Sequence, residues 1–119
     1  EDMITDRTER FIVGELIREK TLHYLDEEIP HGIAVDIENM KLRDSGDLYD
    51  IDATIYCEKD SHKGIVIGKN GRKLKGIGKQ ARLEIEKFLG CKVNLQLWVK
   101  VNKNWREKET LVRKMGYRE

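Results

Sequence analysis

The stretch of sequence that decides the fold lies in the middle of the chain, at residues 64–77. It reads Gly64-Ile65-Val66-Ile67-Gly68-Lys69-Asn70-Gly71-Arg72-Lys73-Leu74-Lys75-Gly76-Ile77. A short apolar segment runs into two glycines that are separated by two polar residues, and a basic segment follows. We expect a short helix over 62–67, capped by Ser61, and a longer helix over 72–89 that ends at Gly90. The two glycines predict a tight bend between these helices, because glycine adopts backbone conformations that other residues avoid.

The bend has the features of a site for phosphate groups. Gly68 and Gly71 let a ligand approach the backbone without a Cβ in the way. The helix that begins at Arg72 directs its unpaired amides and the positive end of its dipole to the same place. Lys69, Arg72 and Lys73 add positive charge, and the apolar residues before the bend offer flat surface for bases. The segment is therefore expected to contact a polynucleotide.

The distribution of charge supports this interpretation. The chain has 119 residues and a formal net charge of +1. Residues 59–82 contain one acid, Asp60, and eight basic residues: Lys59, Lys63, Lys69, Arg72, Lys73, Lys75, Lys79 and Arg82. This basic window thus carries +7 and the remainder −6. A concentrated basic segment attracts a polyanion locally, although a lysine-rich, solvated helix face would look the same.

The N-terminal third predicts one long helix. Asp6 and Glu9 form a capping pair at its start, and Pro30 is the expected stop signal. An apolar stripe at helical spacing is predicted to face the core; it consists of Ile12, Val13, Leu16, Ile17 and Tyr24. A second apolar patch, Phe11, Leu22 and Leu25, falls on another side of the helix and is expected to meet a different part of the protein.

Three segments predict β-strands. Residues 33–42 alternate between apolar and polar, with a change of parity at Glu38-Asn39 that indicates a bulge. Residues 49–57 follow a polar turn at 44–47, and residues 93–101 give the clearest alternation. A connection through two helices joins parallel neighbours and is right-handed. We therefore expect an α+β fold of order α-β-β-α-α-β, with a mixed three-stranded sheet and the helices on one face.

Length and composition set further limits. One domain is expected at 1–101, with a tail over 102–119 that is predicted to form a short helix, and the start at Glu1 suggests a part of a longer protein. No apolar run approaches the roughly 20 residues that cross a bilayer. Cys57 and Cys91 have no zinc-ligand spacing, so we expect reduced thiols in a cytoplasmic protein, with no metal, no cofactor and no catalytic residue.

The segment Val66 to Ile77 resembles the signature of KH domains, an Ile-Gly-x-x-Gly loop followed by spaced aliphatic residues. The order of the predicted elements is similar to the type II, bacterial form of that family. Nearly the whole chain also resembles the C-terminal domain of a family of bacterial GTPases, in pieces such as Glu28-Ile29-Pro30-His31 and Leu97-Trp98-Val99-Lys100-Val101.

This resemblance implies a function. KH domains hold about four nucleotides of single-stranded RNA against the glycine loop. The candidate RNA-binding residues are Lys63, Gly64, Ile65, Ile67, Gly68, Lys69, Asn70, Gly71, Arg72, Lys75 and Gln80. The resemblance further implies binding of the 3′ end of small-subunit ribosomal RNA during maturation of the small ribosomal subunit. It also implies an N-terminal GTPase domain as an intramolecular partner, peripheral contact with the inner face of the cell membrane, and a monomer.

Three other interpretations of the sequence compete with RNA binding. The phosphate loop of nucleotide hydrolases needs four residues between its glycines and Ser or Thr after the Lys, whereas three residues separate Gly64 from Gly68 and Asn70 follows Lys69. Gly76-Ile77-Gly78-Lys79-Gln80-Ala81 fits a dinucleotide-binding pattern but falls inside a predicted helix, where Gly78 instead suggests close helix packing or, alternatively, a place in the lining of the groove. A KH-fold module that docks proteins and has no affinity for RNA is the remaining rival. Both glycines and Lys69 favour the RNA-binding interpretation over it.

Overall fold

The computed structural model describes residues 2–25 and 32–102 of the chain, with side chains from Arg7 onward. Its elements are α1 (Asp2–Leu25), β1 (Ile33–Leu42), β2 (Leu48–Cys57), α2 (Asp60–Ile67), the 3-10 turn η1 (Lys69–Gly71), α3 (Arg72–Leu89) and β3 (Lys92–Val101). The predicted order α-β-β-α-α-β is confirmed. The predicted stop at Pro30 and the predicted tail helix lie outside the described residues.

The three strands form one mixed sheet in the order β1-β2-β3. β1 and β2 are antiparallel, and β2 and β3 are parallel, as a crossover through α2 and α3 requires. The register shifts between Ile37, which pairs with Ala53, and Asn39, which pairs with Asp52. Glu38 is the extra residue, so the predicted bulge is confirmed. Because β3 is an edge strand, one of its sides has no strand beside it within the described part of the chain.

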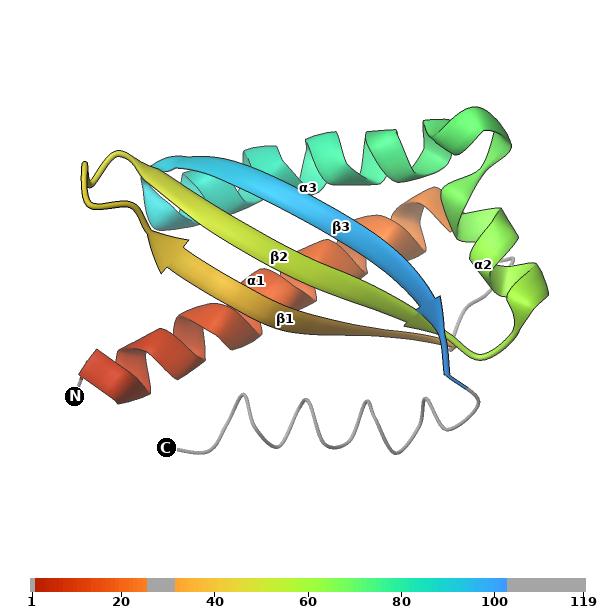
Figure 1. Cartoon of the computed structure of the whole chain (residues 1–119), viewed down its shortest axis with the longest axis horizontal. Helices are drawn as coiled ribbons and strands as arrows, with labels where there is room; N and C mark the ends of the chain where they lie inside the picture. Colours follow the sequence, from red (N-terminus) through yellow and green to blue (C-terminus); the bar gives the residue numbers. More distant parts are fainter. Residues whose placement is uncertain (1, 26–31, 103–119) are drawn as a thin grey trace.

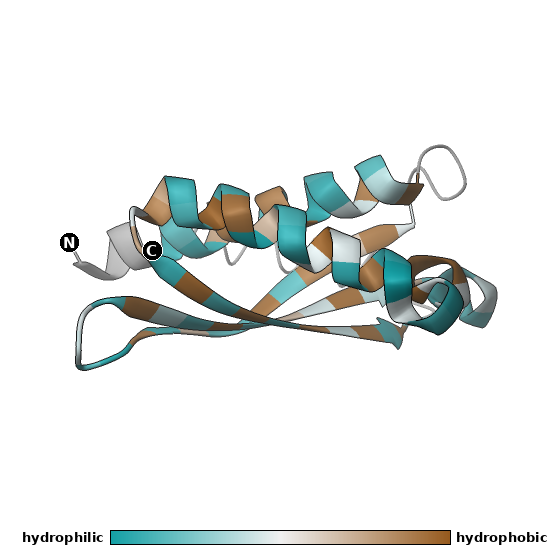
Figure 2. Cartoon of the chain, turned by 90° about the horizontal axis from the view of Figure 1, so that it is seen from above, coloured by the Kyte–Doolittle hydropathy of each residue, from teal (hydrophilic) through white to brown (hydrophobic). Residues whose placement is uncertain are grey.

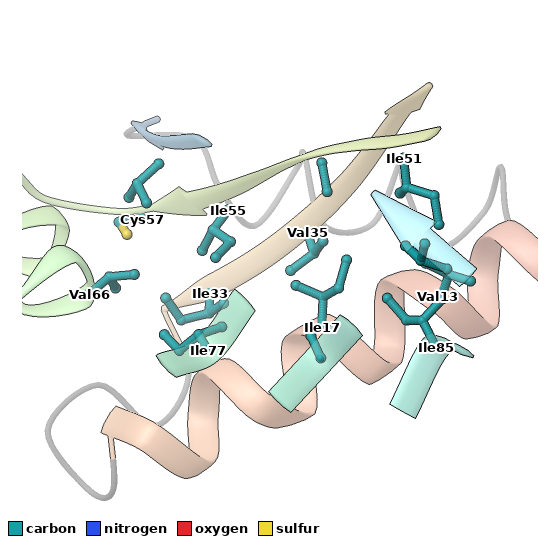
Figure 3. Packing of buried hydrophobic residues seen from close by; sticks show 14 of the residues in the cluster. Val13, Ile17, Ile33, Val35, Ile51, Ile55, Cys57, Val66, Ile77 and Ile85 are labelled. Carbon is teal, nitrogen blue, oxygen red and sulfur yellow. The ribbon is translucent and has the colours of Figure 1, made fainter. Parts of the chain in front are cut away.

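The molecule has two layers. Figures 1 and 2 show α1 and α3 side by side on the same face of the twisted sheet, with α2 at the end where β2 finishes. Figure 3 shows the space between the layers, where Val13 and Ile17 of α1 and Ile77 and Ile85 of α3 point toward Ile55 and its neighbours on the sheet. Among the described residues, no helix is long and apolar enough to cross a membrane.

The buried row of α1 differs from the prediction. Val13, Ile17, Thr21 and Leu25 are spaced four residues apart, and all four are fully buried. Thr21 can stand in this row because its hydroxyl donates a hydrogen bond of 2.8 Å to the Ile17 carbonyl of the preceding turn. This polar residue hid the continuation of the row, so the assignment of Leu25 to a separate patch is wrong. Leu22, also assigned to that patch, packs against the same core.

The helix ends also differ in part. α1 begins at Asp2 and not at Asp6, and α2 begins at Asp60 with no side-chain hydrogen bond at its cap, so Ser61 does not cap it. The bounds of α3 agree with the prediction, and Gly90 ends it in a left-handed conformation while its N–H bonds to the Glu86 carbonyl. In the last turn of α3, Phe88 is 41% exposed, whereas Leu89 packs against the core.

The start of β3 is tied to the β1–β2 hairpin by polar side chains. Arg43 donates to both carboxylate oxygens of Asp50, at 2.7 and 3.0 Å, and Asn94 of β3 donates to the same carboxylate at 3.0 Å. The hydrogen bonds from Arg43 and then Asn94 lower the pKa of Asp50 to about 2. The end of the sheet farthest from α2 therefore has its own set of contacts, separate from the glycine loop.

Candidate nucleic-acid interface

The bend between α2 and α3 is a turn of left-handed backbone. Gly68 has φ 75° and ψ 175°, Asn70 has φ 57° and Gly71 has φ 73°. The Gly68 N–H bonds to the Gly64 carbonyl at 2.9 Å, and the Gly71 N–H bonds to the Gly68 carbonyl at 3.1 Å. A Cβ at Gly68 would lie 2.6 Å from the Cβ of Lys73. The chain therefore passes so close to the start of α3 that only glycine fits at Gly68.

The polar residues of the loop face solvent, whereas the apolar residues before it are divided. Lys69, Asn70 and Arg72 are exposed. Val66 is fully buried and fixes α2 to the core, while Ile65 and Ile67 are half-buried and pack against its margin. The loop thus stands on a fixed base and presents an amide, a guanidinium and an ammonium group outward.

The start of α3 adds donors and positive charge. No side chain caps the helix at Gly71, and the Arg72 N–H bonds to the Lys69 carbonyl within the loop. Arg72, Lys75 and Lys79 are exposed and spaced by three and four residues, which places them on one side of the helix. These three residues form a cationic stripe that starts at the loop. Anions near this end of a helix are stabilised by its dipole.

Arg82, at the end of the basic window, is partly neutralised. Its Nη1 donates to Glu86 Oε2 at 3.1 Å, and the same oxygen accepts a hydrogen bond of 3.0 Å from the backbone N–H of Val93. Glu86 therefore fastens the start of the edge strand β3 to α3. This carboxylate takes up part of the positive charge that the sequence assigns to the window.

The two later glycines of α3 lie against different elements. A Cβ at Gly76 would lie 2.6 Å from Cε2 of Tyr24, so the ring of Tyr24 on α1 packs directly on the backbone of α3. A Cβ at Gly78 would lie 3.6 Å from Leu97 Cδ1 on β3, which is an ordinary contact distance. Close helix packing thus requires glycine at Gly76, and the prediction that it does so at Gly78 is wrong. One side of α3 faces α1, and another faces the edge strand.

The structure brings most of the candidate residues together. Lys63 and Gly64 on α2, the half-buried Ile65 and Ile67, the loop from Gly68 to Gly71, and Arg72 all lie at the corner between α2 and α3, with Lys75 one turn along α3. Gln80 lies apart, about 12 Å along the helix axis from Arg72 at 1.5 Å per residue. It lines a depression together with Lys20, His23 and Tyr24 of α1. Sequence spacing alone gave no sign that α1 approaches α3 there.

The described residues offer little for redox or metal chemistry. Burial raises the pKa of the Cys57 thiol to about 11, while Lys63 lowers it to a smaller extent. Cys57 is therefore an unreactive core residue. No group of three or more His, Cys, Asp or Glu side chains in the described ranges could hold a metal ion.

Comparison with known proteins identifies the family. The family model described as KH domain matches residues 28–106. GTPase Era of Alkaliphilus oremlandii is 66% identical over 117 residues, which are 98% of this chain and 40% of the relative. GTPase Era of Alkaliphilus metalliredigens is 64% identical over 116 residues, 98% of this chain and 39% of the relative. The chain thus spans about two fifths of the length of these curated relatives.

Two solved structures agree with the fold. A point variant of Aquifex aeolicus Era bound to GDP and aluminium fluoride matches with a TM-score of 0.80 and 41% identity, over 92% of this chain and 37% of the other. The structure of Era with MgGDPNP and nucleotides 1506–1542 of 16S ribosomal RNA gives the same values. The stretch of Era that the chain matches is the KH domain and not the GTPase domain, so this chain carries no GTPase active site. The chain belongs to the KH domain family and, within it, closely resembles the C-terminal domain of GTPase Era.

Proposed function

We propose that this chain binds single-stranded RNA through the glycine loop and the adjacent surface between α3 and the edge strand β3. The observation that carries the proposal is the loop itself. It combines left-handed backbone at Gly68 and Gly71 with exposed Lys69 and Asn70 at the uncapped start of a basic helix. Such a turn lets the phosphates approach its backbone and its cations while leaving the bases free to reach the surface beside α3.

The surface beside the loop suits a polynucleotide in its chemistry. Gly78 has no side chain, and the half-buried Leu97 faces it from β3, so bases can approach the helix backbone and an apolar wall. Lys63, Lys69 and Arg72 lie at the corner where the phosphates would run. The relative that was solved with nucleotides 1506–1542 of 16S ribosomal RNA supports ribosomal RNA as the ligand.

The test is a double substitution in the loop, Lys69→Asp with Asn70→Asp. Both residues are exposed, and Asp tolerates the left-handed conformation of Asn70, so the fold should persist. Two carboxylates would then face the phosphates, and placing like charges next to each other in an interface costs several kcal/mol of binding free energy. The variant should no longer bind a single-stranded oligonucleotide of about four nucleotides. Calorimetry measures this binding. Dispersed amide NMR signals would confirm that the domain is still folded.

A matched control changes the net charge by the same amount elsewhere. Lys41→Asp with Lys87→Gln replaces exposed cations on β1 and in the last turn of α3, away from the loop. Its RNA affinity should fall far less than that of the loop variant. If the folded loop variant binds RNA as tightly as the control does, the RNA site is not at the loop. The alternative, a KH module that docks proteins, would then be favoured.

The finer biological role rests on the resemblance to Era. Action on the 3′ end of small-subunit ribosomal RNA during maturation of the small ribosomal subunit, in the cytoplasm, is part of the proposal. Cooperation with a GTPase domain, peripheral membrane contact and a monomeric state are further predictions. The proposed action on the 3′ end can be tested by cross-linking the complete protein to ribosomal RNA and mapping the cross-linked positions. Cross-links outside the 3′ end would contradict it.

A further inference from the structure

A second surface on the opposite side of α3 has the composition of a ligand site. The depression between α1 and α3 has a volume of about 500 Å³, and the described residues that line it are Lys20, His23, Tyr24 and Gln80. This volume falls within the range of sites for small ligands. The hollow lined by these four residues is named the α1–α3 depression.

The four side chains converge although they come from different elements. Lys20 precedes His23 by three residues and Tyr24 by four, so all three lie on one side of α1. Tyr24 is held in place because its ring packs on the backbone of Gly76, one turn before Gln80. His23 meets the Tyr24 ring edge-on, with centroids 6.2 Å apart and an angle of 78°. Tyr24, which is held in place, and the exposed His23 thus form an aromatic wall between an ammonium group and an amide.

The chemistry of this wall favours a nucleotide. Lys20 is a cation, Gln80 and Tyr24 offer hydrogen-bond donors and acceptors, and no carboxylate is among the described lining residues. Imidazole and phenol rings provide surfaces on which a base stacks, whatever its identity. A phosphate on Lys20 and a base against His23 would use both kinds of group.

The depression is connected to the loop by charge. The cationic stripe Arg72, Lys75 and Lys79 runs along α3 from the loop and ends one residue before Gln80. A strand that leaves the loop along this stripe therefore arrives at the depression. The groove against β3 takes only about four nucleotides in KH domains, so a longer RNA has residues left for a second contact.

From this arrangement we infer that the α1–α3 depression is an accessory RNA subsite. It binds one nucleotide of the strand that extends beyond the loop, with the phosphate on Lys20 and the base against His23 and Tyr24. The inference rests on the proposed RNA binding at the loop. It adds a place on α1 and a preference for longer single strands.

The test compares two uniform single-stranded RNAs, one of about four nucleotides, which fills only the loop and groove, and one of about twelve. Calorimetry measures both with the 119-residue chain and with a Lys20→Gln, His23→Ala variant. Loss of one phosphate contact and one stacked base should weaken the longer RNA about tenfold and reduce its log–log salt slope by about 0.7. The affinity for the short RNA should stay the same. Lys41→Gln, on the exposed part of β1, is the control for loss of one positive charge.

The outcomes separate this inference from the proposed function. If the variant binds both RNAs as the unchanged chain does, the depression is not an RNA subsite, and a protein-binding role would replace it. Equal weakening of both RNAs would also overturn the inference, because the effect would then act through the loop. If neither RNA binds even to the unchanged chain, the proposed function itself fails.

Discussion

At the scale of single residues, the loop depends on two glycines that are left-handed for different reasons. Gly68 has a combination of φ 75° and ψ 175° that is almost restricted to glycine, and an added Cβ would meet the Cβ and the backbone nitrogen of Lys73 at 2.6 and 3.0 Å. Gly71 is in the ordinary left-handed helical region, and an added Cβ would have no neighbour within 4 Å. The first glycine is required by space and by conformation, the second by conformation alone.

This difference predicts unequal effects of the two alanine substitutions. Gly71→Ala should lower the free energy of unfolding by about 1 kcal/mol, the cost of a left-handed residue with a Cβ. Gly68→Ala should lower it by about 2 kcal/mol or more, because strain and the clash with Lys73 add. Urea denaturation of the two variants measures both values. Equal losses would show that the contact with Lys73 relaxes without cost.

At the scale of elements, α3 has two sides that use glycine differently. Gly76 receives the ring of Tyr24 from α1, whereas Gly78 faces Leu97 of β3 at an ordinary distance. Replacement of glycine by alanine within a helix gains up to about 1 kcal/mol of helix propensity. At Gly78 this gain is expected in full, since no neighbour has to move.

We therefore predict opposite signs for the two substitutions in α3. Gly78→Ala should raise the unfolding free energy by up to about 1 kcal/mol, and Gly76→Ala should lower it by about 1 kcal/mol, because it displaces the Tyr24 ring. In a Tyr24→Ala background the penalty at Gly76 should disappear, as a double-mutant cycle by thermal denaturation would show. Destabilisation by Gly78→Ala would contradict the geometry.

At the scale of the whole molecule, charge is separated along the chain. The window 59–82 carries +7 and the remaining residues −6, but the structure neutralises part of the window through Arg82 and Glu86. If RNA binds at the loop as proposed, the strand contacts a limited set of cations, because the remainder of the chain is acidic overall.

The salt dependence of RNA binding should reflect this small number of contacts. If Lys63, Lys69 and Arg72 neutralise about three phosphates, the logarithm of the affinity should fall with the logarithm of salt with a slope of about −2 for a short strand. Titrations at several KCl concentrations give this slope directly. A slope near zero would mean that the basic window has no part in binding.

Local patterns in the sequence determined much of this molecule. The alternation in each strand, the bulge at Glu38, the bounds of α3 and the glycine loop all arise from neighbours along the chain, so they could be predicted from it. The parallel placement of β3 also followed, because a crossover through helices has one common geometry. The grouping of the loop residues with Lys63 and Arg72 needed only the short distance between them in the sequence.

Only the tertiary structure decided what lies on each side of α3. Thr21 is buried in the same row as Leu25 because its hydroxyl donates to a carbonyl within α1, and a hydrophobic pattern does not identify such a polar residue as buried. Tyr24 packs on Gly76, and Lys20 and Gln80 line the same depression, although the residues of each pair lie more than fifty positions apart in the sequence. Such distant pairs are set by how two helices pack on one sheet, since interhelical distance and angle follow from side chains of both layers at once. The sequence determined the loop, and the packing of α1 against α3 determined the surface to which the loop leads.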